Sequence, residues 1–289
     1  MSISFLSECK DKVLNRIDAL LPDTNKIVSS MRYSALADSK CIRAGLVFAS
    51  GNLNKEISNA ALIDMAASIE LMHTYSLIHD DLPSMDNDEM RRGQASNHLK
   101  YNEATAILAG DALQALAYET IVSSLEITQE QKIHSIKALA NACGHEGMIL
   151  GQQYDLDAEK NEYNDIKKIH ELKTGKLIQV AMTMPHLGNS NQKNQLVIMD
   201  EVGKDLGLAF QIMDDVLEVS TDSSTLGKSN QSDLINKKLT YVSAYGMQES
   251  IDQAKALSNA CISKLENSFN NNEVTSLLEL AKFMVEREN

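Results

Sequence analysis

The sequence predicts an all-α fold built as a bundle of long helices, and three observations support this prediction. Apolar residues recur at helical spacing through most of the 289-residue chain. Glycine occurs only 13 times and proline only 3 times, so helix breakers are rare. Clusters of β-branched or aromatic residues, bounded by turn dipeptides at strand spacing, are scarce, which disfavours a β-sandwich or barrel.

The first expected helix begins at Phe5 and stops at Pro22, because proline cannot continue a helix. The stretch 57–82 would form a helix about 39 Å long at 1.5 Å per residue. No heptad pattern and no repeat of fixed period runs through the chain, so coiled-coil and solenoid folds are disfavoured. Breaks are expected at 83–93, around 190 and over 220–238. The other expected helices cover 25–36, 40–50, 101–125, 130–156, 163–184 and 192–219, with two or three shorter ones up to 284.

Composition excludes several functional classes. A net charge of −13 disfavours a surface that follows nucleic-acid phosphates. The N-terminus carries acids and lysines where a signal peptide needs an apolar stretch, and no run reaches membrane-spanning length. The cysteines are scattered without CxxC pairs, which predicts a reducing compartment, no structural zinc and a cytoplasmic location. These cysteines are Cys9, Cys41, Cys143 and Cys261.

The first acidic cluster lies where the 57–82 helix must end. Asp80 and Asp81 immediately precede Leu82-Pro83, and Asp86 follows closely. A helix C-terminus carries partial negative charge, so acids there are unfavourable, and a positive group should offset them. Taken alone, such a pair could be a solvated helix end.

The second acidic cluster, Asp214, Asp215 and Glu218, ends another apolar helical stretch, with Asp214 and Glu218 four residues apart on one face. Two acidic pairs that both emerge from buried helices favour a site for a hard divalent cation. Magnesium suits this ligand set, because it is held by one or two carboxylates while substrate phosphates complete the octahedron. No EF-hand loop, HExxH motif or Cys/His set indicates calcium or zinc.

Basic residues occur where an anion would need them, although each could also be an ordinary surface residue. Arginine offers bidentate contacts to phosphate oxygens. The glycine in Lys173-Thr174-Gly175-Lys176 predicts a kink that turns Lys173 inward. His73 precedes Asp80 by one heptad and so shares its helix face. The remaining basic candidates are Lys40, Arg43, Arg91 and Arg92.

These residues together resemble the trans-isoprenyl diphosphate synthase family, most closely its bacterial farnesyl diphosphate synthases (geranyltranstransferases). The resemblance covers nearly the whole chain. Its motifs, in the order of the family, are IHDDLPSMDNDEMRRG, AILAGDALQALAY, GQQYDLDAE, HELKTGKLI, LGLAFQIMDD and TLGKSNQSD.

The resemblance implies one polyprenyl synthase domain over 1–289, an all-α barrel or bundle around a central cavity with both acidic motifs facing that cavity. It implies a Mg²⁺-dependent prenyltransferase that condenses isopentenyl diphosphate head-to-tail with dimethylallyl and then geranyl diphosphate, giving farnesyl diphosphate and diphosphate. It also implies a homodimer that neither binds nucleic acid nor inserts stably into membranes.

The same resemblance assigns residues to roles. The implied metal ligands are Asp80, Asp86 and Asp214, with Asp81 and Asp215 in support or coordinating through water. The implied contacts to the allylic diphosphate are Arg91, Lys173, Thr174, Gln211 and Lys228. Arg91 and Lys173 are also implied to be catalytic, together with the three metal ligands. The implied isopentenyl diphosphate contacts are Lys40, Arg43, His73 and Arg92.

Tyr75 is the predicted determinant of product length. It lies five residues before Asp80, about 7.5 Å along the helix axis. Shorter-chain family members carry an aromatic residue here, so a tyrosine floor should stop growth near fifteen carbons, although Ser76 beside it is small.

The chain departs from the family pattern at four places. The usual GGKRLRP reads Asp38-Ser39-Lys40-Cys41-Ile42-Arg43-Ala44, which would weaken isopentenyl diphosphate binding. Glu218 replaces the usual aspartate, and Gln231 and Val242 replace a glycine and a proline near a loop.

The resemblance leaves alternatives open. These are a geranylgeranyl diphosphate synthase, a non-catalytic partner subunit of a prenyl synthase and a class I terpene synthase. The DDVLE sequence differs from the second metal motif usual in terpene synthases, and a non-catalytic subunit usually loses an acidic motif that this chain retains.

Overall fold

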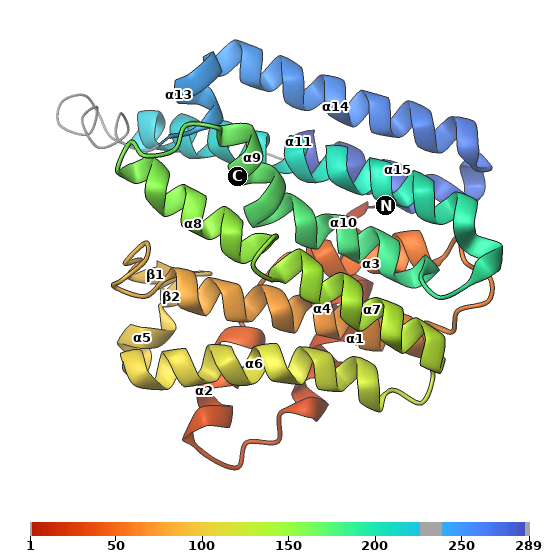
Figure 1. The fold of residues 1–289 in the computed structure, drawn as a ribbon, viewed down its shortest axis with the longest axis horizontal. Coiled ribbons are helices and arrows are strands. Elements are labelled where there is room, and N and C mark those ends of the chain that lie inside the picture. The colour runs from red at the N-terminus through yellow and green to blue at the C-terminus, as the bar shows by residue number, and fades with distance from the viewer. Residues whose placement is uncertain (1, 226–238, 287–289) are drawn as a thin grey trace. The chain divides into compact units, whose positions relative to one another are not determined.

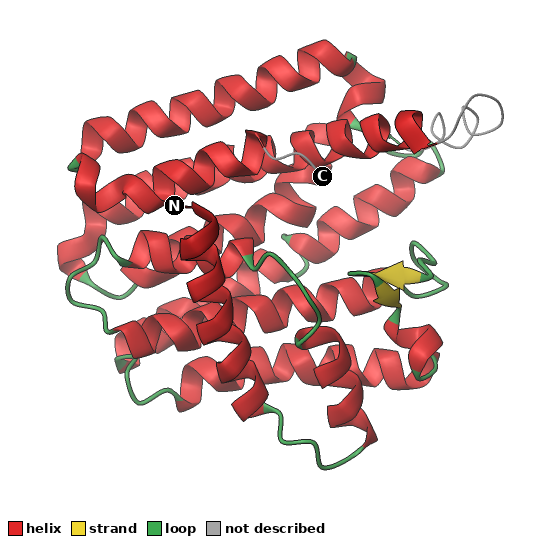
Figure 2. Ribbon diagram, turned by 180° about the vertical axis from the view of Figure 1, so that it is seen from behind, coloured by secondary structure: helices red, strands yellow, loops and turns green. Residues whose placement is uncertain are grey.

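The computed structural model describes residues 2–225 and 239–286, and within them it is almost entirely helical (Figures 1 and 2). The described chain divides into two compact units. Unit 1 comprises residues 1–136 and 184–189, and unit 2 comprises residues 137–183 and 190–289. The expected all-α class is confirmed, whereas a single domain over 1–289 stays a prediction.

Unit 1 contains most of the long helices expected in the first half of the chain. α4 has no single apolar face and is buried around most of its circumference, as expected for a central helix. α6 lies alongside it (Figure 1). The elements are α1 (Ser2–Leu20), α2 (Lys26–Ala35), α3 (Ile42–Gly51), α4 (Asn59–Asp80), β1 (Met90–Arg91), β2 (Gln94–Ala95), α5 (Asn97–Lys100), α6 (Glu103–Ser123) and a 3₁₀ turn (Met184–His186).

Unit 2 is organised around α11, which packs on α10 and α14. One apolar cluster joins α8, α9 and α11 through Ala158, Ile169 and Ile212. The elements are α8 (Met148–Glu159), α9 (Ile166–His170), a π-helical turn (Glu171–Gly175), α10 (Lys176–Thr183), a 3₁₀ turn (Ser190–Gln192), α11 (Lys193–Thr225), α13 (Tyr241–Tyr245), α14 (Met247–Ser268) and α15 (Asn271–Glu286). α7 (Gln129–Cys143) crosses the boundary between the units.

Three expectations about the elements were wrong. The predicted helix over 130–156 is divided, because the chain turns at Gly144–Gly147, where a Cβ on Gly147 would lie 2.1 Å from the Ala142 carbonyl oxygen. α11 continues to Thr225, beyond the expected end at 219. α14 has 22 residues and is not one of the short C-terminal helices expected.

Candidate active site

The first acidic motif forms a tight turn at the end of α4. Asp80 is the last helical residue, and the chain then reverses so that the Asp86 amide donates to the Asp80 carbonyl at 2.9 Å. The Asn87 amide donates to the Leu82 carbonyl at 3.1 Å, with Asn87 in the left-handed region at φ 53°. Pro83 therefore ends the helix as predicted, and the turn returns Asp86 to the backbone of Asp80.

Asp81 is buried within this motif and is held by Arg91. The Arg91 Nε and Nη2 atoms lie 2.8 and 2.5 Å from Asp81 Oδ1, and Nη2 also lies 2.7 Å from Asp88 Oδ2. Burial raises the pKa of the Asp81 carboxyl, and the bonds from Arg91 oppose that rise. Arg91 thus supplies the positive group expected beside the acids at this helix end.

Arg91 and Arg92 are placed by a β-hairpin that the sequence did not predict. β1 and β2 pair antiparallel, and the two connecting residues, Arg92 and Gly93, have φ of 53° and 75°, as in a type I′ turn. The Arg92 guanidinium donates to the Ser34 carbonyl at 3.3 Å. Both arginines border a small pocket within unit 1, whose lining includes Tyr33, Thr74, Asp81, Arg91, Arg92 and Gln94.

Three of the residues predicted to bind isopentenyl diphosphate come together in unit 1, namely Arg43, His73 and Arg92. Arg43 Nη1 lies 3.2 Å from His73 Nε2. Because a guanidinium can only donate, this His73 nitrogen must accept and the imidazole is neutral. Burial, followed by the charge of Arg43, holds the pKa of His73 well below 6.5. Arg92 and Arg91 contribute to the same shift. Lys40 is exposed just before α3.

α3 begins within the segment around Cys41 that departs from the family pattern, and its first turn has an unusual cap. Cys41 is the N-cap residue, lies in the left-handed region at φ 46° and makes no side-chain capping bond. Buried Glu70, from α4, accepts the Ala44 amide hydrogen at 2.9 Å instead. This carboxylate replaces a conventional cap and suits the positive end of the helix. Glu70 could not be predicted from the sequence, because it lies 26 residues from Ala44 and the contact forms only when α4 packs on α3.

Tyr75 is 5% exposed and lies one turn before His79 on α4. The two rings meet edge to face, with centroids 5.6 Å apart and an interplanar angle of 87°. His79 Nε2 donates to the Ile107 carbonyl on α6 at 3.0 Å. Gly110 leaves room for this imidazole, since a Cβ there would lie 2.2 Å from His79 Nε2.

In unit 2, the kink predicted at Lys173–Lys176 is a π-helical turn over Glu171–Gly175. Such a turn inserts an extra residue into a helix and often marks a functional position. Two glycines allow neighbouring helices to approach its backbone. A Cβ on Gly151 would lie 2.2 Å from the Lys173 nitrogen, and one on Gly207 would lie 2.8 Å from the Gly175 Cα.

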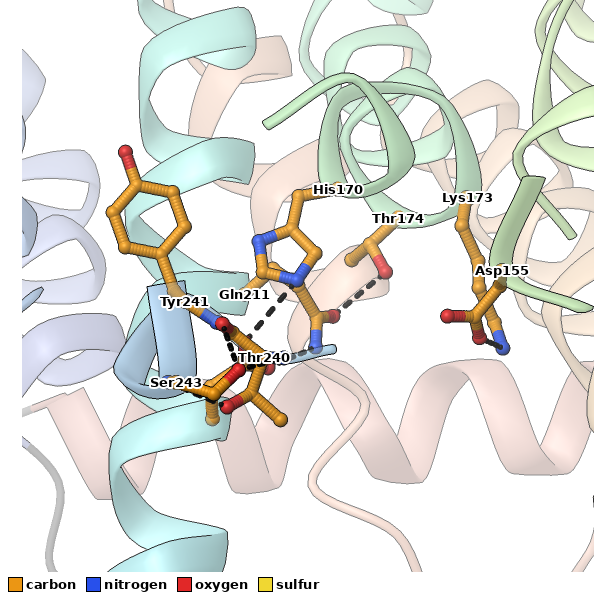
Figure 3. A network of polar contacts seen from close by, with 9 residues as sticks. Asp155, His170, Lys173, Thr174, Gln211, Thr240, Tyr241 and Ser243 are labelled. Atoms are coloured by element: carbon orange, nitrogen blue, oxygen red, sulfur yellow. Dashed lines mark hydrogen bonds and ion pairs between the residues drawn. The ribbon is translucent and has the colours of Figure 1, made fainter. Parts of the chain in front are cut away.

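The π-helical turn presents Lys173 and Thr174 to neighbouring side chains (Figure 3). Lys173 Nζ lies 2.7 Å from Asp155 Oδ2 on α8. The Thr174 hydroxyl donates to Gln211 Oε1 on α11 at 2.7 Å. Two residues of the predicted diphosphate site are therefore in contact. Asp155 belongs to the GQQYDLDAE motif, in which the sequence pattern assigns it no role.

The second acidic motif lies on α11 and contains two different carboxylate environments. Asp214 is partly buried and Glu218 is exposed, whereas Asp215 is 5% exposed. The Tyr241 amide donates to Asp215 Oδ2 at 2.6 Å, and Gln211 Nε2 donates to Asp215 Oδ1 at 3.3 Å. His170 Nε2 lies 3.3 Å from Asp215 Oδ2. Asp215 is thus an internal acceptor.

Some predictions cannot be placed on this structure. Lys228 and Gln231 lie outside the described residues. Among the described residues, no group of three His, Cys, Asp or Glu side chains is arranged to hold a metal ion unaided.

None of the helices in the described chain is both long enough and apolar enough to cross a membrane.

Comparisons with known proteins identify the family. The polyprenyl synthetase family model matches residues 24–280. The chain is 38% identical over 284 residues to farnesyl diphosphate synthase of Escherichia coli, covering 96% of this chain and 95% of that one. It is 36% identical over 269 residues to geranylgeranyl pyrophosphate synthase 7 of Arabidopsis thaliana, covering 91% and 77% of the two chains.

A solved structure shares the fold. The geranyltransferase of Helicobacter pylori, crystallised with magnesium and isoprenyl diphosphate, matches with a TM-score of 0.85 and 28% identity over 99% of this chain and 98% of that one. The chain therefore belongs to the polyprenyl synthetase family and has the helical isoprenoid synthase fold.

Proposed function

We propose that this protein is a Mg²⁺-dependent trans-prenyltransferase that makes farnesyl diphosphate. Isopentenyl diphosphate would be joined head-to-tail to dimethylallyl diphosphate and then to geranyl diphosphate. The observation that carries the proposal is the 38% identity to an enzyme named farnesyl diphosphate synthase over 96% of this chain, with both acidic motifs retained. The match to the family model extends across both units, which supports one functional domain over 1–289.

The carboxylates present fit magnesium. Asp80, Asp86 and Asp214 would provide hard oxygen ligands, and the turn that brings the Asp86 backbone to Asp80 suits two ligands for one group of ions. Each motif alone offers fewer ligands than a protein-only metal site, as expected where substrate phosphates complete the coordination. Bound Mg²⁺ would supply positive charge that stabilises the departing diphosphate.

The basic residues support two diphosphate sites of different character. Arg43, Arg92 and Lys40, beside neutral His73, would bind isopentenyl diphosphate without metal. A neutral imidazole can donate one hydrogen bond there without a charge of its own.

The allylic diphosphate would contact Arg91, Lys173, Thr174 and Gln211, with Lys228 also proposed. Arg91 and Lys173 now pair with carboxylates, which hold these long side chains in defined positions. An incoming diphosphate would meet cations whose orientation is already set, which lowers the entropy cost of binding.

The reaction would proceed by cleavage of the allylic carbon–oxygen bond, attack on the cation by the isopentenyl double bond, and loss of a proton. The protein would contribute orientation, exclusion of water and stabilisation of charge on the leaving group. No covalent nucleophile is required. Buried Tyr75 supports a fifteen-carbon product; geranylgeranyl diphosphate is the second candidate, favoured by the identity to the Arabidopsis thaliana synthase.

An exposed apolar face on α6 supports the proposal of a homodimer. Ile107, Leu108 and Val122 are 43%, 54% and 53% exposed. Burying such a face against a second copy would be favourable. Separately from the homodimer, we propose a cytoplasmic location for the protein. Light scattering after size-exclusion chromatography should give twice the mass of 31.9 kDa, and a monomer would contradict the homodimer.

The proposed function is tested by incubating the protein with geranyl and isopentenyl diphosphates and Mg²⁺, followed by chromatography of the products. Farnesyl diphosphate, formed only when Mg²⁺ is present, is the expected result. A geranylgeranyl product would identify the second candidate. Release of diphosphate without elongation would identify a terpene synthase, and no turnover would identify a non-catalytic subunit.

A further inference from the structure

His170 belongs to a buried network behind the second acidic motif. It is 5% exposed and lies at the end of α9, immediately before the π-helical turn. Its Nε2 atom is 3.3 Å from Asp215 Oδ2. Its ring stacks on that of Tyr241, with centroids 5.8 Å apart and an interplanar angle of 22°. His170 therefore contacts two residues that follow it by 45 or more positions.

The contacts around Asp215 show which atoms donate and which accept hydrogen bonds. An ionised Asp215 only accepts, so His170 Nε2 must carry the proton that points to Oδ2. Among the described residues, His170 Nδ1 has no hydrogen-bond partner. The Tyr241 amide donates to the same Oδ2 at 2.6 Å. Asp215 Oδ2 is thus shared by an imidazole and a backbone amide.

The other oxygen of Asp215 orients Gln211. Gln211 Nε2 donates to Asp215 Oδ1 at 3.3 Å, which leaves Gln211 Oε1 to accept from Thr174 at 2.7 Å. The amide is therefore fixed in one orientation from both ends. Figure 3 shows His170, Thr174, Gln211 and Tyr241 converging on this region from separate elements.

We propose that His170 is a positioning residue for binding of the magnesium–diphosphate complex at the second motif. It donates to Asp215 and so fixes that carboxylate between α9, α11 and α13. Asp215 in turn fixes Gln211 and the turn of α11 that carries Asp214. This inference rests on the proposed function and extends it to a residue that is itself neither a metal ligand nor a substrate contact.

The test compares three substitutions of His170. His170→Gln retains a donor near the place of Nε2, whereas Asn is too short to reach and Leu cannot donate. Titration calorimetry with Mg²⁺ and inorganic diphosphate should show reduced affinity in the Asn and Leu variants. His170 acts on Asp214 only through Asp215, so the loss should not exceed the range of about 10- to 100-fold that is typical when a direct partner of a metal ligand is removed. The Gln variant should keep most of the wild-type affinity, because it still donates to Asp215.

Kinetics separate a local effect from general damage. KM for geranyl diphosphate should rise in the Asn and Leu variants, whereas KM for isopentenyl diphosphate should not change. His145→Leu, at an exposed histidine of the same unit, is the matched control and should behave as the wild type. Thermal unfolding of each variant identifies any that fails to fold, and the Gln–Asn pair still gives a comparison between two polar residues.

The outcomes distinguish the two levels of inference. Wild-type affinity in a folded Asn or Leu variant, or equal losses in the Gln and Asn variants, would overturn the role of His170 while leaving the proposed function intact. A wild-type protein that neither binds Mg²⁺ with diphosphate nor elongates geranyl diphosphate would refute the proposed function and, with it, this inference.

Discussion

Replacing Gly151 by alanine should destabilise the protein, although alanine is the better helix former. Gly151 lies in α8 against the π-helical turn. A Cβ at this position would lie 2.2 Å from the Lys173 nitrogen, 2.7 Å from its Cα and 2.8 Å from the Leu172 carbonyl carbon. All three atoms belong to the main chain, so no side-chain rotation can relieve the overlap.

The expected magnitude follows from two opposing effects. Alanine gains about 1 kcal/mol of intrinsic helix propensity over glycine. Overpacking by an added carbon costs about 1–3 kcal/mol or more, and the short contacts with the main chain place this site at or beyond the upper end. The net loss in free energy of unfolding should therefore be about 2 kcal/mol. Separation of α8 from the turn should also weaken the Lys173–Asp155 pair and raise KM for the allylic substrate.

The assay is urea unfolding followed by circular dichroism at 222 nm, with kinetics on the same samples. Gln153→Ala, an exposed position on α8, is the control and should change the free energy of unfolding by no more than about 0.5 kcal/mol. If Gly151→Ala is as stable as the wild type or more stable, the close approach of α8 to the π-helical turn is refuted, together with the reasoning that makes this glycine necessary.

Two further predictions concern product length and pH. Tyr75→Ala should shift the product from fifteen toward twenty carbons, because it removes a buried ring one turn before His79. Chromatography of the products measures the shift, with exposed Tyr245→Ala as the control. An unchanged product distribution would exclude Tyr75 as the residue that limits chain length. The depressed pKa of His73 means that the unfolded chain binds a proton near pH 6.5 that the folded chain does not, so stability is lost as pH falls below 6.5. His73→Gln should therefore lose up to about 1.4 kcal/mol less than the wild type between pH 7.5 and 5.5 in urea unfolding, and parallel losses in the two proteins would disprove a neutral His73.

Helix positions were largely predictable because their signals are local. Asn25 caps α2 through its side chain, Pro22 follows the end of α1, and Pro83 follows the end of α4. The division at Gly144–Gly147 escaped prediction because apolar residues continue at helical spacing on both sides of it. The β1–β2 hairpin has strands of two residues, too short for an alternating pattern to appear.

The candidate active site likewise contains some residues that could be predicted from the sequence and others that could not. The two acidic clusters could be recognised in the sequence because acids at the ends of apolar helices are locally unusual. The choice of Asp80, Asp86 and Asp214 as metal ligands came from the family resemblance and stays a prediction. The sequence could not identify Glu70 or His170, whose partners lie 26 and 45 residues away. Such pairings arise only when helices pack, so a single sequence carries no signal for them. The assignment of Asp215 as an internal acceptor likewise required Tyr241, at the start of α13.

The central claim is that carboxylates of both acidic motifs serve one magnesium-dependent prenyl transfer. Its most direct test is the single-turnover rate of farnesyl diphosphate formation at saturating Mg²⁺ in the wild type, Asp80→Asn and Asp214→Asn. Each variant should be slower by about 10²- to 10³-fold, the loss typical when a group that stabilises transition-state charge is removed. If either folded variant reacts at the wild-type rate, its motif does not take part and the claim is contradicted.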